Sequence, residues 1–75
     1  MPLTMSPQGK QLTIQRIGGK EEVRRHLEEL GFVIGGLVTV VSETAGNMIV
    51  NVKGARIAIG LAMANHIICI SKEEE

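Results

Sequence analysis

The sequence has few of the residues that usually carry chemistry. Its 75 residues include no Asp, Trp or Tyr, one Cys (Cys69) and one Phe (Phe32). A single Cys excludes an intramolecular disulfide, and with two His it is too few for a structural zinc site, which takes about four such ligands. One aromatic side chain also excludes the stacking platforms that bind single-stranded nucleic acid. This composition argues against an enzyme, and we expect no catalytic residues.

Excess charge and long apolar runs are also missing. Eight Lys and Arg balance eight acidic residues, whereas a free-standing nucleic-acid-binding domain usually has a basic excess. We therefore expect no nucleic-acid partner. No apolar run approaches the ~20 residues of a membrane span, and the N-terminus lacks the charged and apolar regions of a signal peptide. We expect a cytoplasmic protein without direct membrane insertion.

The sequence is rich in short β-branched segments separated by turn residues. These segments predict strands, over residues 12–17, 37–42, 48–53, 55–59 and 67–70. Tight turns are expected at Ala45–Asn47 and at Gly54, a helical turn over 60–65, and an extended lead-in or short helical turn over 1–10. Together they predict a mainly β fold with one main α-helix, a small and partly open β-barrel of about five strands. We expect a single domain over 1–75, with its core over about 9–70 and a polar tail over 71–75.

The main helix is predicted over residues 20–30. Its apolar stripe at i, i+4 and i+7 consists of Val23, Leu27 and Leu30. Gly19 is expected to be its N-cap. Gly31 is expected to be left-handed at the C-terminus, with Phe32 packed on Leu27 in a Schellman motif.

Alternation along the strands predicts which side chains form the core. In the last strand, Ile68 and Ile70 are expected to point inward and Cys69 to face away, half-buried. The predicted core consists of Leu12, Ile14, Val23, Leu27, Leu30, Phe32, Val38, Val40, Val50, Val52, Ile57, Ile59, Ile68 and Ile70.

Two features could hold a small ligand. His66 and Cys69 have a usable metal-ligand spacing, and His26 is the other imidazole, but ferrous iron also favours carboxylates. No acidic residue lies between Ile49 and Lys72. Gly18–Gly19 precedes a helix N-terminus, a place that binds phosphate, but it lacks the spacing of a nucleotide-binding loop. We favour packing roles for both features and predict neither metal nor cofactor.

Five residues are candidates for binding a protein partner. They are Arg24, Arg25, Arg56, Leu61 and Met63. The two helical arginines either dock an acidic partner or pair with neighbouring glutamates on a solvated face. Arg56 is expected to point out of the barrel, where it either makes a contact or covers apolar surface with its stem. Leu61 and Met63 form either an exposed apolar patch, which would mark an interface, or a cap over the open end of the barrel.

Two segments resemble a known family. The first is the helix Arg24-Arg-His-Leu-Glu-Glu-Leu30 followed by Gly31-Phe32-Val-Ile-Gly35, and the second is Gly54-Ala-Arg56-Ile57-Ala58-Ile59. In this order they resemble the FeoA family, the small cytoplasmic component of bacterial ferrous iron uptake, over about residues 9–70. The resemblance implies an SH3-like barrel.

The resemblance also implies a function. It implies a non-enzymatic accessory or regulatory protein of ferrous iron transport, which contacts a FeoB-type transporter and its cytoplasmic G-protein domain and is recruited through it to the inner face of the membrane. The alternative is an SH3-like accessory domain related to those of iron-dependent transcriptional repressors. An iron-carrying chaperone is disfavoured by the small number of ligands. Self-association into a homo-oligomer is compatible with an exposed apolar patch.

Overall fold

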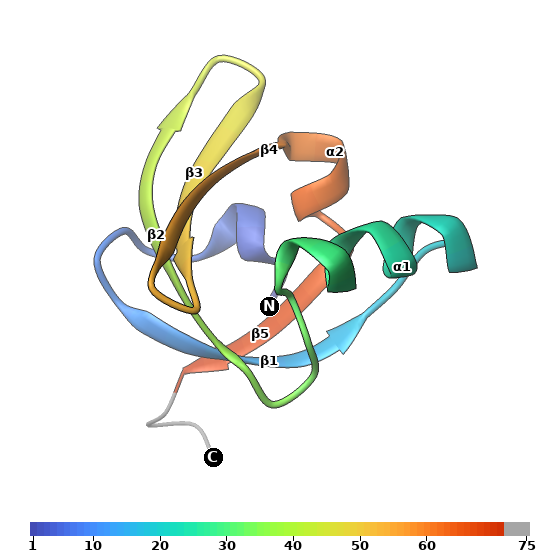
Figure 1. Ribbon diagram of the computed structural model, residues 1–75. Coiled ribbons are helices and arrows are strands. Elements are labelled where there is room, and N and C mark those ends of the chain that lie inside the picture. The colour runs from blue at the N-terminus through green and yellow to red at the C-terminus, as the bar shows by residue number, and fades with distance from the viewer. Residues whose placement is uncertain (72–75) are drawn as a thin grey trace.

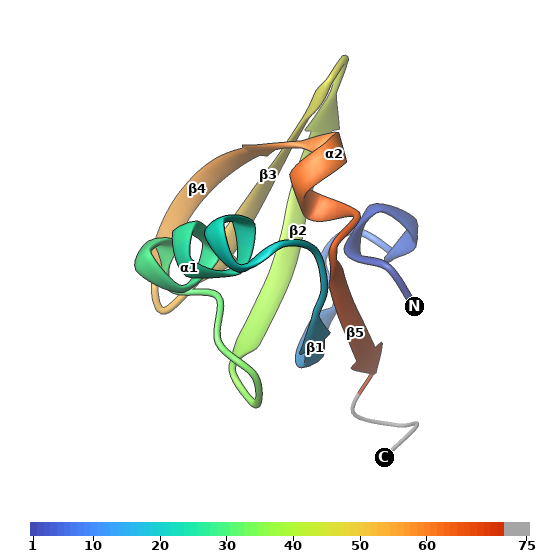
Figure 2. The same cartoon turned by 90° about the vertical axis from the view of Figure 1, so that its right-hand side faces the viewer.

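The computed structural model describes residues 1–71, which form one five-stranded antiparallel sheet with two helices. The elements are a 3₁₀ turn η1 (Leu3–Met5), β1 (Gln11–Ile17), α1 (Glu21–Leu30), β2 (Leu37–Thr44), β3 (Asn47–Val52), β4 (Ala55–Gly60), α2 (Leu61–Ala64) and β5 (Ile67–Ser71). The strand order is β4-β3-β2-β1-β5. The sheet bends so that α2 connects its two outermost strands across the open side (Figures 1 and 2). The predicted mainly β, partly open barrel with one main helix is confirmed.

The main helix ends as the sequence predicts but begins one residue later than expected. Its N-cap is the extended Lys20 and not Gly19. At the other end Gly31 is left-handed, with φ 110°. The N–H of Phe32 donates to the Leu27 carbonyl (2.9 Å) and that of Gly31 to the Glu28 carbonyl (3.0 Å), which is the Schellman pattern.

Both hairpins turn on two residues. The β2–β3 turn is Ala45–Gly46, with Gly46 at φ 88°, and Asn47 already belongs to β3 rather than to the predicted turn. The β3–β4 turn is Lys53–Gly54, with φ 52° and 77°. Positive φ at both central residues, as at Lys53 and Gly54, is what a type I′ turn requires. A type I′ turn matches the twist of the flanking strands.

The core is formed by side chains from the strands, α1, η1 and α2. It consists of Leu3, Leu12, Ile14, Ile17, Leu27, Phe32, Val38, Val40, Met48, Val50, Val52, Ile59, Ala64, Ile67 and Cys69. Val23, Leu30 and Ile57 are only partly buried but pack against it. Leu3 is fully buried, so the packed part of the chain begins before the predicted residue 9.

The prediction for β5 was wrong: Ile67 and Cys69 face the core, each 0% exposed, while Ile68 and Ile70 are only half-buried. The cause is the pairing with β1, where Cys69 lies opposite the buried Ile14. Directly opposed residues of an antiparallel pair share a face of the sheet. The two-residue alternation therefore continues along β5, but in the opposite phase.

The N-terminal segment pairs with the outer edge of β5, the edge that does not face β1. Pro2 bridges Ile68, and the amide of Cys69 donates to the carbonyl of Met1 (2.7 Å). At the other end, Ser71 is the last residue of β5 and is buried, so it is not part of the predicted polar tail. The rest of that tail, 72–75, lies outside the described residues.

Candidate partner-binding surface

The two helical arginines are exposed on α1. Arg25 forms an ion pair with Glu21 (2.9 Å), and both side chains are mostly in solvent, at 69% and 74% exposed. An exposed i,i+4 pair of this kind contributes only about 0.3–0.5 kcal/mol. Arg24 is exposed as well. The solvated-face interpretation accounts for Arg25, and both guanidinium groups remain accessible to a partner.

Of the two interpretations of Leu61 and Met63, an exposed apolar patch or a cap, the structure agrees with the cap. Leu61 and Met63 are half-buried and pack against the core. This four-residue helix therefore covers the open side of the sheet between β4 and β5 (Figure 2). The five candidate residues lie on three elements: the arginines on α1, Arg56 near the start of β4, and Leu61 and Met63 on α2.

The most exposed large apolar side chains lie elsewhere and were missed. Ile34 is 68% and Leu37 is 50% exposed, in the connection after α1 and at the start of β2. Met5, in η1, is 75% exposed. Their exposure was hard to predict from the sequence. Ile34 belongs to a turn, and Leu37 begins a strand in which the following residues alternate between core and surface as expected.

The outer face of the sheet carries a line of polar side chains. Cα pairing places Gln11 opposite Thr39, Thr39 opposite Asn51, and Asn51 opposite Arg56. We call these four residues the polar row. Because directly opposed residues share a face, the row crosses β1 to β4 on the side away from the core. The prediction that Arg56 points out of the barrel agrees with its exposure.

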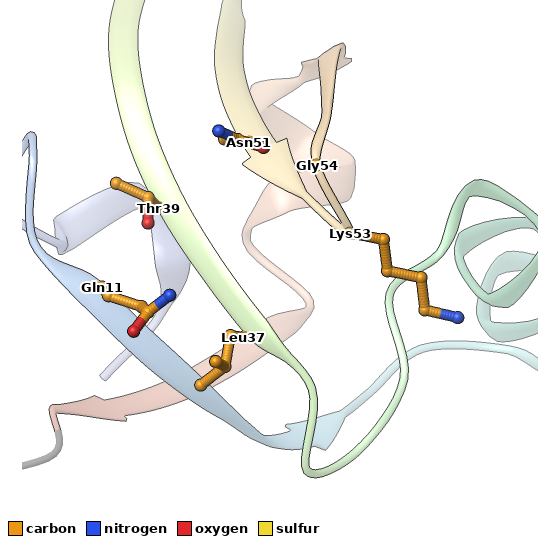
Figure 3. A pocket seen from close by; sticks show the side chains of 6 residues that line it. All are labelled: Gln11, Leu37, Thr39, Asn51, Lys53 and Gly54. Carbon is orange, nitrogen blue, oxygen red and sulfur yellow. The ribbon is translucent and has the colours of Figure 1, made fainter.

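A shallow pocket of about 270 Å³ lies over part of the polar row. It is lined by Gln11, Leu37, Thr39, Asn51, Lys53 and Gly54 (Figure 3). The amide groups of Gln11 and Asn51 and the hydroxyl of Thr39 suit hydrogen bonding to a partner, and half-exposed Leu37 adds apolar contact. The lining includes no carboxylate, imidazole or thiol.

Lys53 occupies an unusual backbone conformation beside the pocket. It is the one non-glycine residue with positive φ among residues 1–71. The common type I′ sequences have Asn or Asp at this position. Its stem runs away from the other lining residues toward the loop after α1 (Figure 3), where its Cδ lies 3.6 Å from the place of a β-carbon on Gly31. Unfavoured backbone conformations that persist are often found at functional sites.

The structure separates the groups considered for ligand binding. His26 is exposed on α1, and the imidazole of His66 packs on Gly19. Cys69 is fully buried, and this burial raises the pKa of its thiol to about 11. No group of three metal-ligating side chains occurs within residues 1–71. The amide of Gly18 donates to the His66 carbonyl (2.8 Å), which gives the glycine pair a packing role.

Within the described part of the chain, neither helix has the length and apolar character needed to cross a membrane.

Comparison with known proteins identifies the family. The model of the FeoA domain family matches residues 1–70. The chain is 28% identical to the crystal structure of an iron uptake regulatory protein (FeoA), over 93% of both chains with a TM-score of 0.85. It is 23% identical to the FeoA protein from Chlorobium tepidum, over 96% of this chain and 70% of that one, with a TM-score of 0.86.

The same fold occurs in a larger protein of another kind. A manganese-dependent transcriptional repressor is 23% identical, over 95% of this chain but 36% of its own, with a TM-score of 0.88. No curated protein matches the sequence. The small β fold, predicted to be SH3-like, is therefore one that FeoA proteins share with a repressor domain. The family match covers nearly the whole sequence, and the chain belongs to the FeoA family.

Proposed function

We propose that this protein is a non-enzymatic accessory or regulatory protein of ferrous iron uptake, which contacts a FeoB-type transporter from the cytoplasmic side. The observation that carries the proposal is the family match over residues 1–70. It is supported by the 28% identity to a protein described as iron uptake regulatory, over 93% of both chains. The protein acts by binding, and its effect falls on transport or on the GTPase cycle of the transporter.

The surface of the molecule supports a role in binding. The polar row and its pocket present hydrogen-bonding groups beside Leu37, a large apolar side chain that is 50% exposed. Protein interfaces commonly combine such apolar contacts with a polar rim. Arg24 and Arg25 offer two further exposed guanidinium groups on α1, where Arg25 is paired with Glu21.

The experiment is an NMR titration of the isotope-labelled protein with the cytoplasmic part of a FeoB-type transporter, with and without guanine nucleotide. We expect localised shift changes in the polar row, in α2 or on the exposed face of α1. A change in GTP hydrolysis rate on adding the protein would show regulation of the G-protein domain. Unchanged spectra at high partner concentration would refute direct contact with this part of the transporter.

The second candidate is a DNA-linked domain, since the chain has the fold of part of a metal-dependent repressor. At 23% identity this likeness concerns the fold alone. Retention on a nucleic-acid column tests it, because binding through phosphate contacts weakens steeply as salt is raised. We expect no retention even at low salt, given the net charge of zero.

A further inference from the structure

The two outermost strands of the sheet differ in how their free edges are covered. The edge of β5 is occupied by the N-terminal segment: Pro2 bridges Ile68, and Met1 exchanges two hydrogen bonds of 2.7 Å with Cys69. The edge of β4 pairs with no other segment of residues 1–71. One edge of the sheet is therefore blocked and the other is open.

The pairing of β4 with β3 shows which backbone groups point outward. The two-residue turn makes Val52 and Ala55 the closing pair, which in such hairpins exchanges hydrogen bonds. Hydrogen-bonded and non-bonded pairs alternate along an antiparallel ladder, so Ile57 and Ile59 also bond to β3. The amide and carbonyl groups of Arg56 and Ala58 are then directed outward, and both residues are exposed.

This open edge has few of the features that usually prevent strand addition. Natural edge strands carry prolines, bulges, inward-pointing charges or exposed charged side chains, and of these β4 has only the exposed charge of Arg56. Residues 55–60 contain no proline, and their register with β3 has no shift. The inward positions are Ile57 and Ile59, and the other exposed side chain, Ala58, is small. In β4 itself only the charge of Arg56 opposes a strand lying alongside, and a carboxylate opposite Arg56 would neutralise it.

The charges around β4 indicate what kind of strand would fit. Arg56 is its single charged residue, and Lys53 lies in the adjoining turn. Four of the five acidic residues within residues 1–71 are on α1, and the fifth, Glu43, is near the far end of β2. The β3–β4 hairpin thus has two cations and no anion of its own. A carboxylate side chain placed opposite Arg56 would add a cross-strand charge pair.

We propose that the open edge of β4 binds an extended acidic segment of the partner protein as a sixth strand of the sheet. The inference rests on the proposed contact with a FeoB-type transporter and assigns the mode and chemistry of that contact. Backbone hydrogen bonds to Arg56 and Ala58 give affinity, as in other cases of strand addition. The guanidinium of Arg56 selects a carboxylate side chain, and Lys53 extends the positive field at one end.

Two variants test the two parts of the inference. Ala58→Pro removes the outward amide donor without breaking a bond to β3, a position where edge strands tolerate proline. Arg56→Glu keeps the backbone and reverses the charge. Each is expected to weaken binding to the cytoplasmic part of the transporter by about tenfold, Ala58→Pro through the lost backbone hydrogen bond and Arg56→Glu through the lost charge pair and the new repulsion. The amides of Arg56 and Ala58 should also gain protection from hydrogen exchange in the complex.

Matched controls separate this mode from the alternatives. Ala58→Ser keeps the amide and should bind like the wild type. Lys20→Glu reverses an exposed charge at the start of α1, a position outside the candidate binding residues, and should leave strand addition intact. Spectra of each variant check that it is folded, and Arg56→Glu remains informative if Ala58→Pro is not. If the wild type binds and neither Ala58→Pro nor Arg56→Glu weakens this binding, the inference is overturned and the proposed function stands.

Two other outcomes are equally decisive. If the wild type does not bind the transporter's cytoplasmic part, the proposed function fails and the docking strand fails with it. If the protein alone forms dimers that Ala58→Pro and Arg56→Glu abolish, the edge is occupied by a second copy and the assignment of an acidic partner is overturned. Sedimentation of the isolated protein over a range of concentrations reads this directly.

Discussion

The imidazole of His66 packs against Gly19, so closely that a β-carbon at position 19 would lie 3.3 Å from the ring atoms Cγ and Nδ1. Gly19 also has φ 91°, a conformation that side chains disfavour. The neighbouring Gly18 donates its amide to the His66 carbonyl (2.8 Å). These contacts join the end of β1 to the segment between α2 and β5, and they give the glycine pair a structural role.

We predict that Gly19→Ala lowers the free energy of unfolding by about 1–3 kcal/mol, because it combines an unfavoured backbone with a close contact. Gly46→Ala is the matched control. Gly46 has nearly the same φ, 88°, but a β-carbon at this position would meet no other part of the chain within 4 Å. Urea denaturation of both variants separates the two causes, and an equal loss in both would show that the His66 contact costs nothing.

The orientation of β5 gives a second prediction. Ile67→Ala should cost about 2–5 kcal/mol of stability, as for other fully buried isoleucines, whereas Ile70→Ala should cost clearly less because Ile70 is only half-buried. The sequence-based assignment of the core predicts the reverse order. Thermal or chemical denaturation of the two variants therefore distinguishes the two phases of the strand, and a greater loss for Ile70→Ala would contradict the structure.

Much of the fold could be predicted because local chemistry and tertiary packing agree. The helix end at Gly31–Phe32 is specified by residues next to one another, and the alternation in β2 and β3 places Val38, Val40, Val50 and Val52 in the core, as observed. In β5 the residues 67–70 are all apolar, so alternation gives no phase. Only the pairing with β1 decides which residues of β5 face the core.

The candidate surface was less predictable for a related reason. Arg56 could be placed outside the barrel from the strand pattern, but the polar row consists of residues far apart in sequence that strand pairing brings together. The sequence alone does not decide whether Leu61 and Met63 form an exposed patch or a cap, because the answer depends on which part of the barrel α2 covers. The open edge of β4 follows from the strand order, which no local pattern encodes.

Burial of Cys69 predicts an unreactive thiol. The side chain is 0% exposed and its pKa is raised to about 11, and thiolates rather than thiols are the reactive species. A thiol reagent at about pH 8, just below the ordinary thiol pKa, should therefore label the native protein far more slowly than the protein in denaturant. Fast labelling under native conditions would show that β5 and its N-terminal cover open readily.

The same shift predicts a dependence of stability on pH. The thiol pKa rises from the ordinary 9.0 to about 11 on folding, so the unfolded chain loses this proton first as pH rises. The stabilising contribution is complete below pH 9 and is lost toward pH 11, by at most about 1.4 kcal/mol per pH unit. Cys69→Ala lacks the group, so the difference between the two stability curves should narrow over this interval. A constant difference would contradict the prediction.

Lys53 allows stability and binding to be separated at one position. Its φ of 52° is unfavourable for a lysine and well tolerated by asparagine, which with Gly54 would give the favoured type I′ pair. We therefore expect Lys53→Asn to raise the free energy of unfolding by a few tenths to about 1 kcal/mol, measured by chemical denaturation. Lys53→Ala removes the same charge without relieving the backbone strain and should give no such gain in stability.

If the ammonium of Lys53 contributes to the positive field beside β4, Lys53→Asn and Lys53→Ala should weaken binding of an acidic partner equally, although only Lys53→Asn is more stable. Unequal weakening would instead attribute the effect to the conformation of the turn.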